Sequence, residues 1–302
     1  GLSRPLLITW VSGIGFIINA LLNYTLVHGF PPLGIKSYGI IGSGLGTAIT
    51  IWIMFFLLLG FSHFDVRLRS LQLIQTKFRR TNIFAELLRL GLPSGATLFA
   101  EIALFSGAGL ILGRYAELVV ASHQISLQMA SLTFMVPLSI SIALTALVGQ
   151  RMGRDDYFGA RSMGNTGLTT LLGIVILTSA FLYFARFQAT MLFTTNVEVI
   201  TLSAKLILFA VVFQIPDVFQ VAANGILRGM KDTKIPMYLC ILSYWCIAFP
   251  LCYYLGVTLE YEAEGVWMGL IIGLTASAFL LNGRLFFLKR RYEAQLVRSI
   301  AR

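Results

Sequence analysis

Long apolar segments restrict what this chain of 302 residues can fold into. Hydrophobic residues make up 57% of the sequence and charged residues only 12%, whereas a soluble domain carries about 25% charged residues. A helix that crosses a bilayer needs about 20 mostly apolar residues. Eight segments meet this requirement, at residues 6–28, 40–61, 86–112, 118–149, 163–185, 199–228, 235–256 and 265–288. The sequence therefore predicts an all-α polytopic membrane protein with eight transmembrane helices.

The basic residues predict how these helices are oriented. If the segment before the first helix is cytoplasmic, all 23 basic residues except Lys36, Arg114, Arg186 and Lys205 lie on the cytoplasmic side. Cytoplasmic loops of membrane proteins carry such an excess of Lys and Arg. The net charge of +10 therefore reflects topology, and we expect membrane lipid and no nucleic acid as a partner. An even number of helices places both ends of the chain in the cytoplasm.

Two basic stretches differ from the apolar segments. Residues 62–85 mix large apolar side chains with five basic ones, a composition typical of an amphipathic helix on the membrane surface. Residues 289–302 form a basic cytoplasmic tail of similar character. These stretches divide the chain into 1–61, 62–85, 86–288 and 289–302.

The first and last helix pairs form a faint repeat. In each pair a short outer loop is followed by Gly-x-x-x-Gly, at Gly42/Gly46 and at Gly265/Gly269. Small residues four apart let helix backbones approach closely. Parallel repeats of this kind occur in some secondary transporters.

Two acidic residues lie inside apolar segments, and they are the main candidates for function. Glu101 is about 15 residues into its segment, which places it near the middle of the membrane at about 1.5 Å per residue. Asp217 directly follows Pro216, whose ring removes a backbone donor and favours a bend. A charge at the bilayer centre costs about 2.5–3.5 kcal/mol on insertion scales. A carboxyl group without water favours its neutral form unless a cation is near, so both residues suit the exchange of a proton or Na⁺ for an organic cation.

Polar and adaptable side chains accompany the two acids. Gln214, Gln220 and Asn224 share one broad helix face with Asp217. Further candidates for a substrate cavity are Gln124, Gln128, Phe134, Met135 and Phe213. For each of these, ordinary packing or hydrogen bonding between helices is the alternative.

Motifs for enzymes and pumps are missing from the sequence. There is no phosphate-binding loop, HExxH or Gly-x-Ser-x-Gly, so we expect no enzyme activity and no cofactor. Asp155–Asp156 could hold a metal or a diphosphate, but the surrounding basic residues favour a charge-balanced turn.

With these residues in view, the chain resembles the multidrug and toxic compound extrusion (MATE) family, in its NorM-like bacterial branch. The matching stretches are Gly91–Glu101 (GLPSGATLFAE), Phe134–Ser139 (FMVPLS) and Gln214–Thr233 (QIPDVFQVAANGILRGMKDT). The resemblance implies a protein of twelve helices in two six-helix lobes, located in the bacterial inner membrane. Residues 1–61 would be the last two helices of the N-terminal lobe, 62–85 the linker and 86–288 the C-terminal lobe, with the first four helices absent.

The resemblance also implies a function and a site. Members export amphiphilic cationic drugs by Na⁺ or H⁺ antiport, with alternating access between the lobes, and we expect a monomer. The cation site of this branch falls on Glu101 and Asp217, which would bind Na⁺ if the transport is sodium-coupled. Some relatives carry a tyrosine one turn before the Asp, where this chain has Phe213.

Two alternatives remain open. A lipid-linked oligosaccharide flippase of the same superfamily would need cationic groups in its cavity for pyrophosphate, and no Lys or Arg is central in any segment. A membrane-embedded prenyl transferase would need paired acidic motifs for Mg²⁺-diphosphate, which only Asp155–Asp156 approaches.

Overall fold

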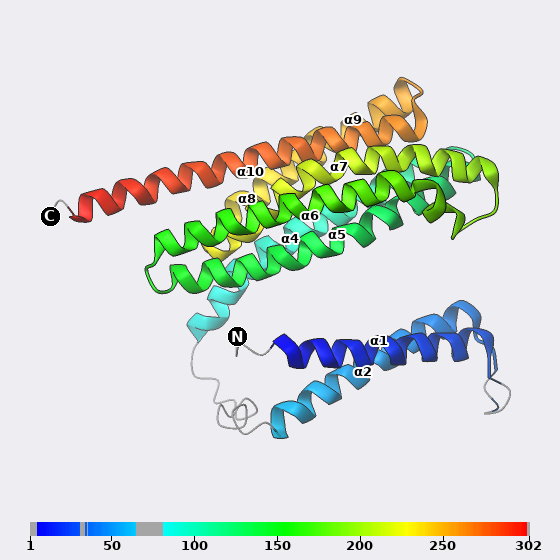
Figure 1. The fold of residues 1–302 in the computed structure, drawn as a ribbon, viewed down its shortest axis with the longest axis horizontal. Coiled ribbons are helices and arrows are strands. Elements are labelled where there is room, and N and C mark those ends of the chain that lie inside the picture. The colour runs from blue at the N-terminus through cyan, green and yellow to red at the C-terminus, as the bar shows by residue number, and fades with distance from the viewer. Residues whose placement is uncertain (1–4, 31–33, 35, 65–80, 301–302) are drawn as a thin grey trace. The chain divides into compact units, whose positions relative to one another are not determined.

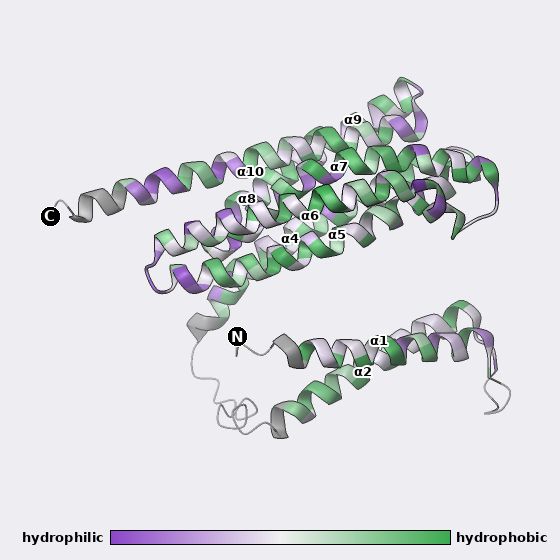
Figure 2. Ribbon diagram, in the orientation of Figure 1, coloured by the Kyte–Doolittle hydropathy of each residue, from purple (hydrophilic) through white to green (hydrophobic). Residues whose placement is uncertain are grey.

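The computed structural model describes residues 5–30, 34, 36–64 and 81–300, and the regular elements among them are helices (Figure 1). In chain order they are α1 (Pro5–His28), α2 (Gly39–Phe64), α4 (Thr81–Leu112), α5 (Glu117–Met152), α6 (Tyr157–Met191), α7 (Val197–Gly229), α8 (Lys234–Ile241), the π-helix η2 (Leu242–Ala248), α9 (Phe249–Tyr253), the π-helix η3 (Tyr254–Thr258) and α10 (Glu262–Ile300). Over this part of the chain, 8 helical spans are long and apolar enough to cross a membrane. Figure 2 shows hydrophobic residues along the middle of the helices. The predicted all-α membrane fold with eight transmembrane helices is confirmed.

The chain divides into two compact units, Gly1–Thr81 and Asn82–Arg302. Most of the predicted surface helix at 62–85 lies outside the described residues, since 65–80 are not among them. The assignment of the two units to the lobes of a larger protein stays a prediction.

The first unit is a pair of helices, α1 and α2, that pack along each other. At Gly42, a Cβ atom would fall on the backbone carbonyl group of Leu26. Nearby, Asn19 donates a hydrogen bond from Nδ2 to Thr50 Oγ1 over 3.4 Å. The glycine permits the close approach that the sequence predicted for this pair, and polar side chains join the two helices inside it.

In the second unit, α7 is the central helix and packs against α5, α6 and α10. Small side chains bring α5 and α7 together, because Ser141 and Thr145 donate hydrogen bonds to the backbone carbonyls of Val221 and Gly225 over 2.8 and 3.0 Å. On α4, buried apolar residues recur every four positions and join the same core, namely Ala100, Leu104, Ala108 and Leu112. This packing fixes α4, α5 and α7 around a shared interior.

The seventh span departs from a regular α-helix. The predicted segment 235–256 forms Lys234–Thr258, in which α8 and α9 alternate with the π-helices η2 and η3. Pro250 lies in the first turn of α9, and proline lacks a backbone donor and crowds the carbonyl four residues earlier. Widening the helix before the proline relieves that crowding.

The last helix continues beyond the predicted end of its span, because α10 reaches Ile300. Contacts with α6 accompany this extension. Arg161 and Glu293 form an ion pair of 2.6 Å, and the rings of Tyr157 and Tyr292 stack with centroids 5.2 Å apart. The start of the predicted basic tail is therefore a helix packed on the bundle.

Candidate functional site

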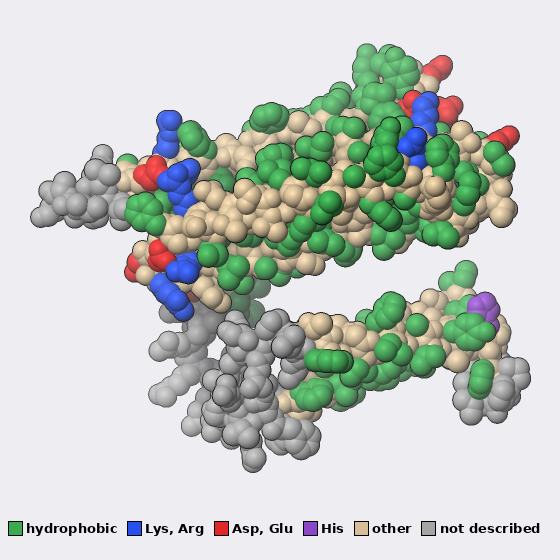
Figure 3. Space-filling view, in the orientation of Figure 1, with side chains coloured by type: hydrophobic (Ala, Val, Ile, Leu, Met, Phe, Trp, Pro, Cys, Tyr) green, Lys and Arg blue, Asp and Glu red, His purple; other side chains and the backbone are tan. Residues whose placement is uncertain are grey.

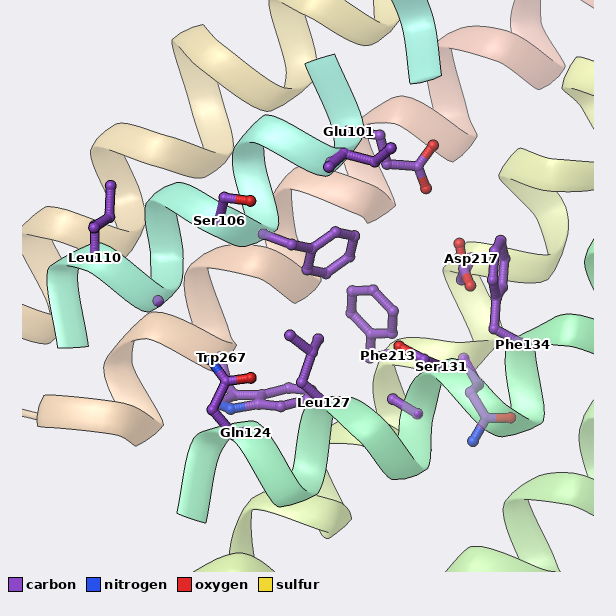
Figure 4. A pocket seen from close by; sticks show the side chains of 15 residues that line it. Glu101, Ser106, Leu110, Gln124, Leu127, Ser131, Phe134, Phe213, Asp217 and Trp267 are labelled. Atoms are coloured by element: carbon purple, nitrogen blue, oxygen red, sulfur yellow. The ribbon is translucent and has the colours of Figure 1, made fainter. Parts of the chain in front are cut away.

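A cavity of about 570 Å³ lies inside the second unit, between α4, α5, α7 and α10. Helix α4 provides one wall, α5 and α7 provide the others, and α10 contributes a tryptophan (Figure 4). The residues that line it are Glu101, Ile102, Phe105, Ser106, Gly109, Leu110, Gln124, Leu127, Ala130, Ser131, Phe134, Phe213, Gln214, Asp217 and Trp267. This volume suits a small organic molecule.

Both candidate acids line this cavity. Glu101 comes from α4 and is partly buried, whereas Asp217 comes from α7 and is only 4% exposed. Figure 4 shows their carboxyl groups turned toward the same space. The two groups are close enough to repel each other when both are charged. The structure therefore brings together two carboxyl groups that are 116 positions apart along the chain (217 minus 101).

Few groups of the protein balance the negative charges that Glu101 and Asp217 carry when ionised. Within the described part of the chain, neither carboxyl group forms a hydrogen bond or an ion pair. Arg228, in the last turn of α7, is the basic residue whose charge acts on Glu101. No group of three or more His, Cys, Asp and Glu is found among the described residues. A cation bound here would need neutral oxygens in addition to the two carboxylates.

Aromatic rings cover the floor of the cavity. The ring of Phe213 meets Phe105 edge to face at 5.8 Å and Trp267 at 6.2 Å. Phe134 lines the cavity from α5. Faces of aromatic rings attract organic cations, so this floor suits an amphiphilic cation beside the two carboxyl groups.

The structure separates the other predicted cavity residues into three groups. Gln124, Phe134, Phe213 and Gln214 line the cavity. Gln128 and Met135 are exposed side chains of α5 and are not among its lining residues. Met135 directly follows Phe134, and consecutive helical residues point about 100° apart, so the two side chains face different directions. Contact of Gln128 and Met135 with a substrate stays a prediction.

Gln220 and Asn224 form the third group, because they are buried beyond the cavity. Gln220 donates from Nε2 to the hydroxyl of Tyr244 over 2.6 Å. Asn224 donates from Nδ2 to Cys240 Sγ over 3.8 Å. Their amides therefore connect α7 to the α8–η2 segment instead of facing the cavity.

Several residues at or near this site were not predicted from the sequence. Trp267, Phe105, Ser106 and Ser131 line the cavity, but nothing in their spacing distinguishes them from packing residues. Tyr244 is fully buried and accepts a hydrogen bond from Gln220 of α7. A polar ring inside the apolar segment 235–256 was the available signal.

The acidic pair Asp155–Asp156 is a turn. Asp156 caps α6, where its Oδ1 accepts from the Gly159 amide over 2.8 Å, and it forms an ion pair of 2.8 Å with Arg151. The Gly159 amide and then Arg151 hold the pKa of Asp156 below its ordinary value. Asp155 has a positive φ of 56°, as turn residues can. These bonds match the predicted charge-balanced turn.

Charged side chains of both signs gather at the two ends of the second unit (Figure 3), and the balance of signs differs between the ends. One end carries the basic residues near the junctions of α5 with α6 and of α7 with α8, and along α10. The other end carries the acidic residues Glu117, Glu198, Glu260, Glu262 and Glu264, with Lys205 paired to Glu264. This separation is the pattern on which the predicted orientation depends.

Comparison with known proteins identifies the family. Residues 93–254, more than half of the chain, match the MatE family model. The chain belongs to the MatE family. That range begins on α4 and ends on η3 and contains both Glu101 and Asp217.

Individual relatives agree with this assignment. The multidrug resistance protein NorM of Vibrio vulnificus (strain YJ016) is 36% identical over 97% of this chain and 64% of its own length. The probable multidrug resistance protein NorM of Acinetobacter baylyi is 35% identical over 95% of this chain and 63% of its own. The chain thus spans less than two thirds of these relatives. The predicted resemblance to the NorM-like branch of the MATE family is confirmed.

Solved structures show the same fold. The crystal structure of the eukaryotic MATE transporter AtDTX14 superposes with a TM-score of 0.84 at 21% identity, covering 93% of this chain and 62% of that one. At this identity the likeness shows a shared fold, that of a helical multi-pass membrane protein.

Proposed function

We propose that this chain is part of an efflux transporter that exports amphiphilic cationic compounds in exchange for Na⁺ or H⁺. The observation that carries the proposal is the cavity itself. It combines two acidic side chains with an aromatic floor, and none of its lining residues is Lys or Arg. The names of the relatives, multidrug resistance proteins, support the same cargo.

The charge of the cavity argues for a cationic cargo. A carboxylate in a site with little water attracts a cation strongly, because the medium screens the charge weakly. The aromatic floor adds attraction for an organic cation and excludes water. A pyrophosphate-linked cargo, as in the flippase alternative, would meet repulsion from both acids. The turn formed by Asp155–Asp156 gives no support to a prenyl transferase, since Asp156 is used as a helix cap.

Competition for the carboxylates would couple the two fluxes. A small cation that enters from outside and a cationic drug cannot both neutralise Glu101 and Asp217 at once. Binding of one therefore favours release of the other, and rocking of two lobes would expose the site to each side in turn. The cavity lies within one unit of one chain and needs no second copy, which supports a monomer. No cofactor enters this scheme.

The orientation follows from charge. If the basic end of the second unit is cytoplasmic, the rule for Lys and Arg in loops is satisfied, and both ends of the chain face the cytoplasm. The relatives come from bacteria, and we place the chain in the bacterial inner membrane.

Transport by the intact protein in proteoliposomes tests the proposal. We expect Glu101→Gln and Asp217→Asn each to reduce cation-driven ethidium export at least tenfold, because each removes one of two charges that hold the cation. Glu198→Gln is the matched control, since Glu198 is an exposed acid in the first turn of α7. Normal export and coupling in both site variants would reject the assignment. Imposing a Na⁺ gradient at fixed pH, and then a pH gradient without Na⁺, identifies the coupling ion.

A further inference from the structure

A buried tyrosine contacts α7, the helix that carries Asp217, but does not line the cavity. Tyr244 belongs to η2, and its side chain has no exposed surface. π-helical turns occur frequently at functional sites, because they rotate a side chain away from the position that an α-helix would give it. In this span the π-helix directs a polar ring into the interior of the bundle.

Two observations connect Tyr244 to the site. Gln220, three residues after Asp217 on α7, donates from Nε2 to the Tyr244 hydroxyl over 2.6 Å. Residues three apart on a helix are neighbours on one face. The hydroxyl is also within electrostatic reach of both Glu101 and Asp217. The phenol oxygen is thus held by a side chain of α7, the helix that carries Asp217.

The side-chain amide of Gln220 also carries an oxygen that could accept a hydrogen bond or bind a cation. Gln220 Oε1 is buried and has no hydrogen-bond partner in the described part of the chain. Buried acceptors are rarely left without a partner. An unpaired buried acceptor on the helix of Asp217 is a group that a bound cation could satisfy.

A small cation would need more oxygen ligands than the two carboxyl groups provide. Hard cations prefer several oxygen ligands, and the cavity offers two carboxyl groups without a third acid. A neutral oxygen adds a ligand without adding repulsion. A phenol oxygen has two lone pairs and one proton. One lone pair accepts from Gln220, and Ser277 and Cys240 are further hydrogen-bonding neighbours of this hydroxyl, so a cation would replace one of these contacts.

We propose that Tyr244 supplies a neutral oxygen ligand to a Na⁺ ion held by Glu101 and Asp217, and that Gln220 is the residue that positions this hydroxyl. The inference rests on the proposed function, because it refines the cation site of that mechanism. It adds η2, which does not line the cavity, to the elements that form the cation site. Loss of the hydroxyl weakens cation binding while the drug-lining residues remain in place.

Direct Na⁺ binding to the purified intact protein tests this inference without transport. Trp267 lines the cavity, so its fluorescence offers a native reporter, and calorimetry gives an independent dissociation constant. We expect Tyr244→Phe to raise the Na⁺ dissociation constant about tenfold, the lower end for residues that support a metal site. Tyr238→Phe is the matched control, because it removes a hydroxyl from α8 at a side chain that is 65% exposed.

A double-mutant cycle separates positioning from simple destabilisation. Gln220→Leu alone should weaken Na⁺ binding to a similar extent, and adding it to Tyr244→Phe should cause little further loss, because both changes remove the same ligand. Fully additive effects would show that Gln220 does not act through Tyr244. Thermal unfolding of each variant identifies any that fail to fold, and Gln220→Leu then tests the ligand on its own.

The outcomes distinguish the inference from the proposed function. Unchanged Na⁺ affinity in Tyr244→Phe, with affinity lost in Glu101→Gln and Asp217→Asn, would overturn the inference and leave the carboxylate site intact. No Na⁺ binding by the unaltered protein would overturn the inference and leave proton-coupled export standing. Unchanged export in both acid variants would instead reject the proposed function.

Discussion

Replacing Gly269 by alanine tests whether close packing of α10 holds the seventh span in place. A Cβ atom at Gly269 would lie 2.5 Å from the backbone nitrogen of Cys252 and 2.7 Å from its Cα. Ordinary contacts between carbon atoms are about 3.5–4.0 Å. Both neighbours are backbone atoms of α9, so a side-chain rotation cannot relieve the clash. The two helices must separate by about 1 Å instead.

The expected cost combines two terms. Overpacking of this kind costs about 1–3 kcal/mol, and alanine gains about 1 kcal/mol over glycine in helix propensity. The variant should therefore lose about 0–2 kcal/mol of unfolding free energy. Gly283→Ala is the matched control on the same helix, because a Cβ there meets nothing within 4 Å. It keeps the propensity gain and avoids the clash, so the two variants should differ by about 1–3 kcal/mol.

Reversible unfolding of the intact protein by SDS in mixed micelles measures this difference, with tryptophan fluorescence as the signal. Because α9 continues from η2, which carries Tyr244, the Gly269 variant should also bind Na⁺ more weakly than the Gly283 variant. Equal unfolding free energies for the two variants would refute the argument that backbone contact at Gly269 sets the distance between these helices.

Two further predictions concern ion pairs and acid sensitivity. Asp232→Asn should cost about 1.5–3 kcal/mol, because its carboxylate pairs at 2.8 Å with Arg284, and the two side chains are only 17% and 19% exposed. Glu293→Gln should cost at most about 1 kcal/mol, since that pair is more exposed; a reversed order in unfolding experiments would contradict this. The low pKa of Asp156, caused first by the Gly159 amide, means that its stabilising contribution is complete above the ordinary pKa of about 3.9 and is lost as the pH falls through the lower folded value. Hydrogen exchange at the start of α6, corrected for intrinsic rates, should rise in acid, and Asp156→Asn should remove that dependence.

The membrane fold could be predicted from the sequence because its main determinant is local. Each spanning segment must satisfy its own backbone hydrogen bonds in lipid, so apolar length alone located all eight spans. The close helix contacts at the glycine pairs could also be predicted, because spacing along one helix is a local feature. At Gly42 and Gly269 no side chain fits against the neighbouring backbone. The π-helical turns of the seventh span were not predicted, because they depend on how Pro250 is accommodated among neighbouring helices.

Only part of the candidate site could be predicted from the sequence. The sequence by itself determined which residues are costly in a membrane, and so identified Glu101 and Asp217 before any contact was known. The structure alone decided that both acids line one cavity, that Trp267 and Phe105 complete its floor, and that Gln220 faces Tyr244. The physical reason is that insertion cost belongs to a single residue in its own helix. Rotation and packing of the helices decide which side chains meet, and those depend on every neighbour at once.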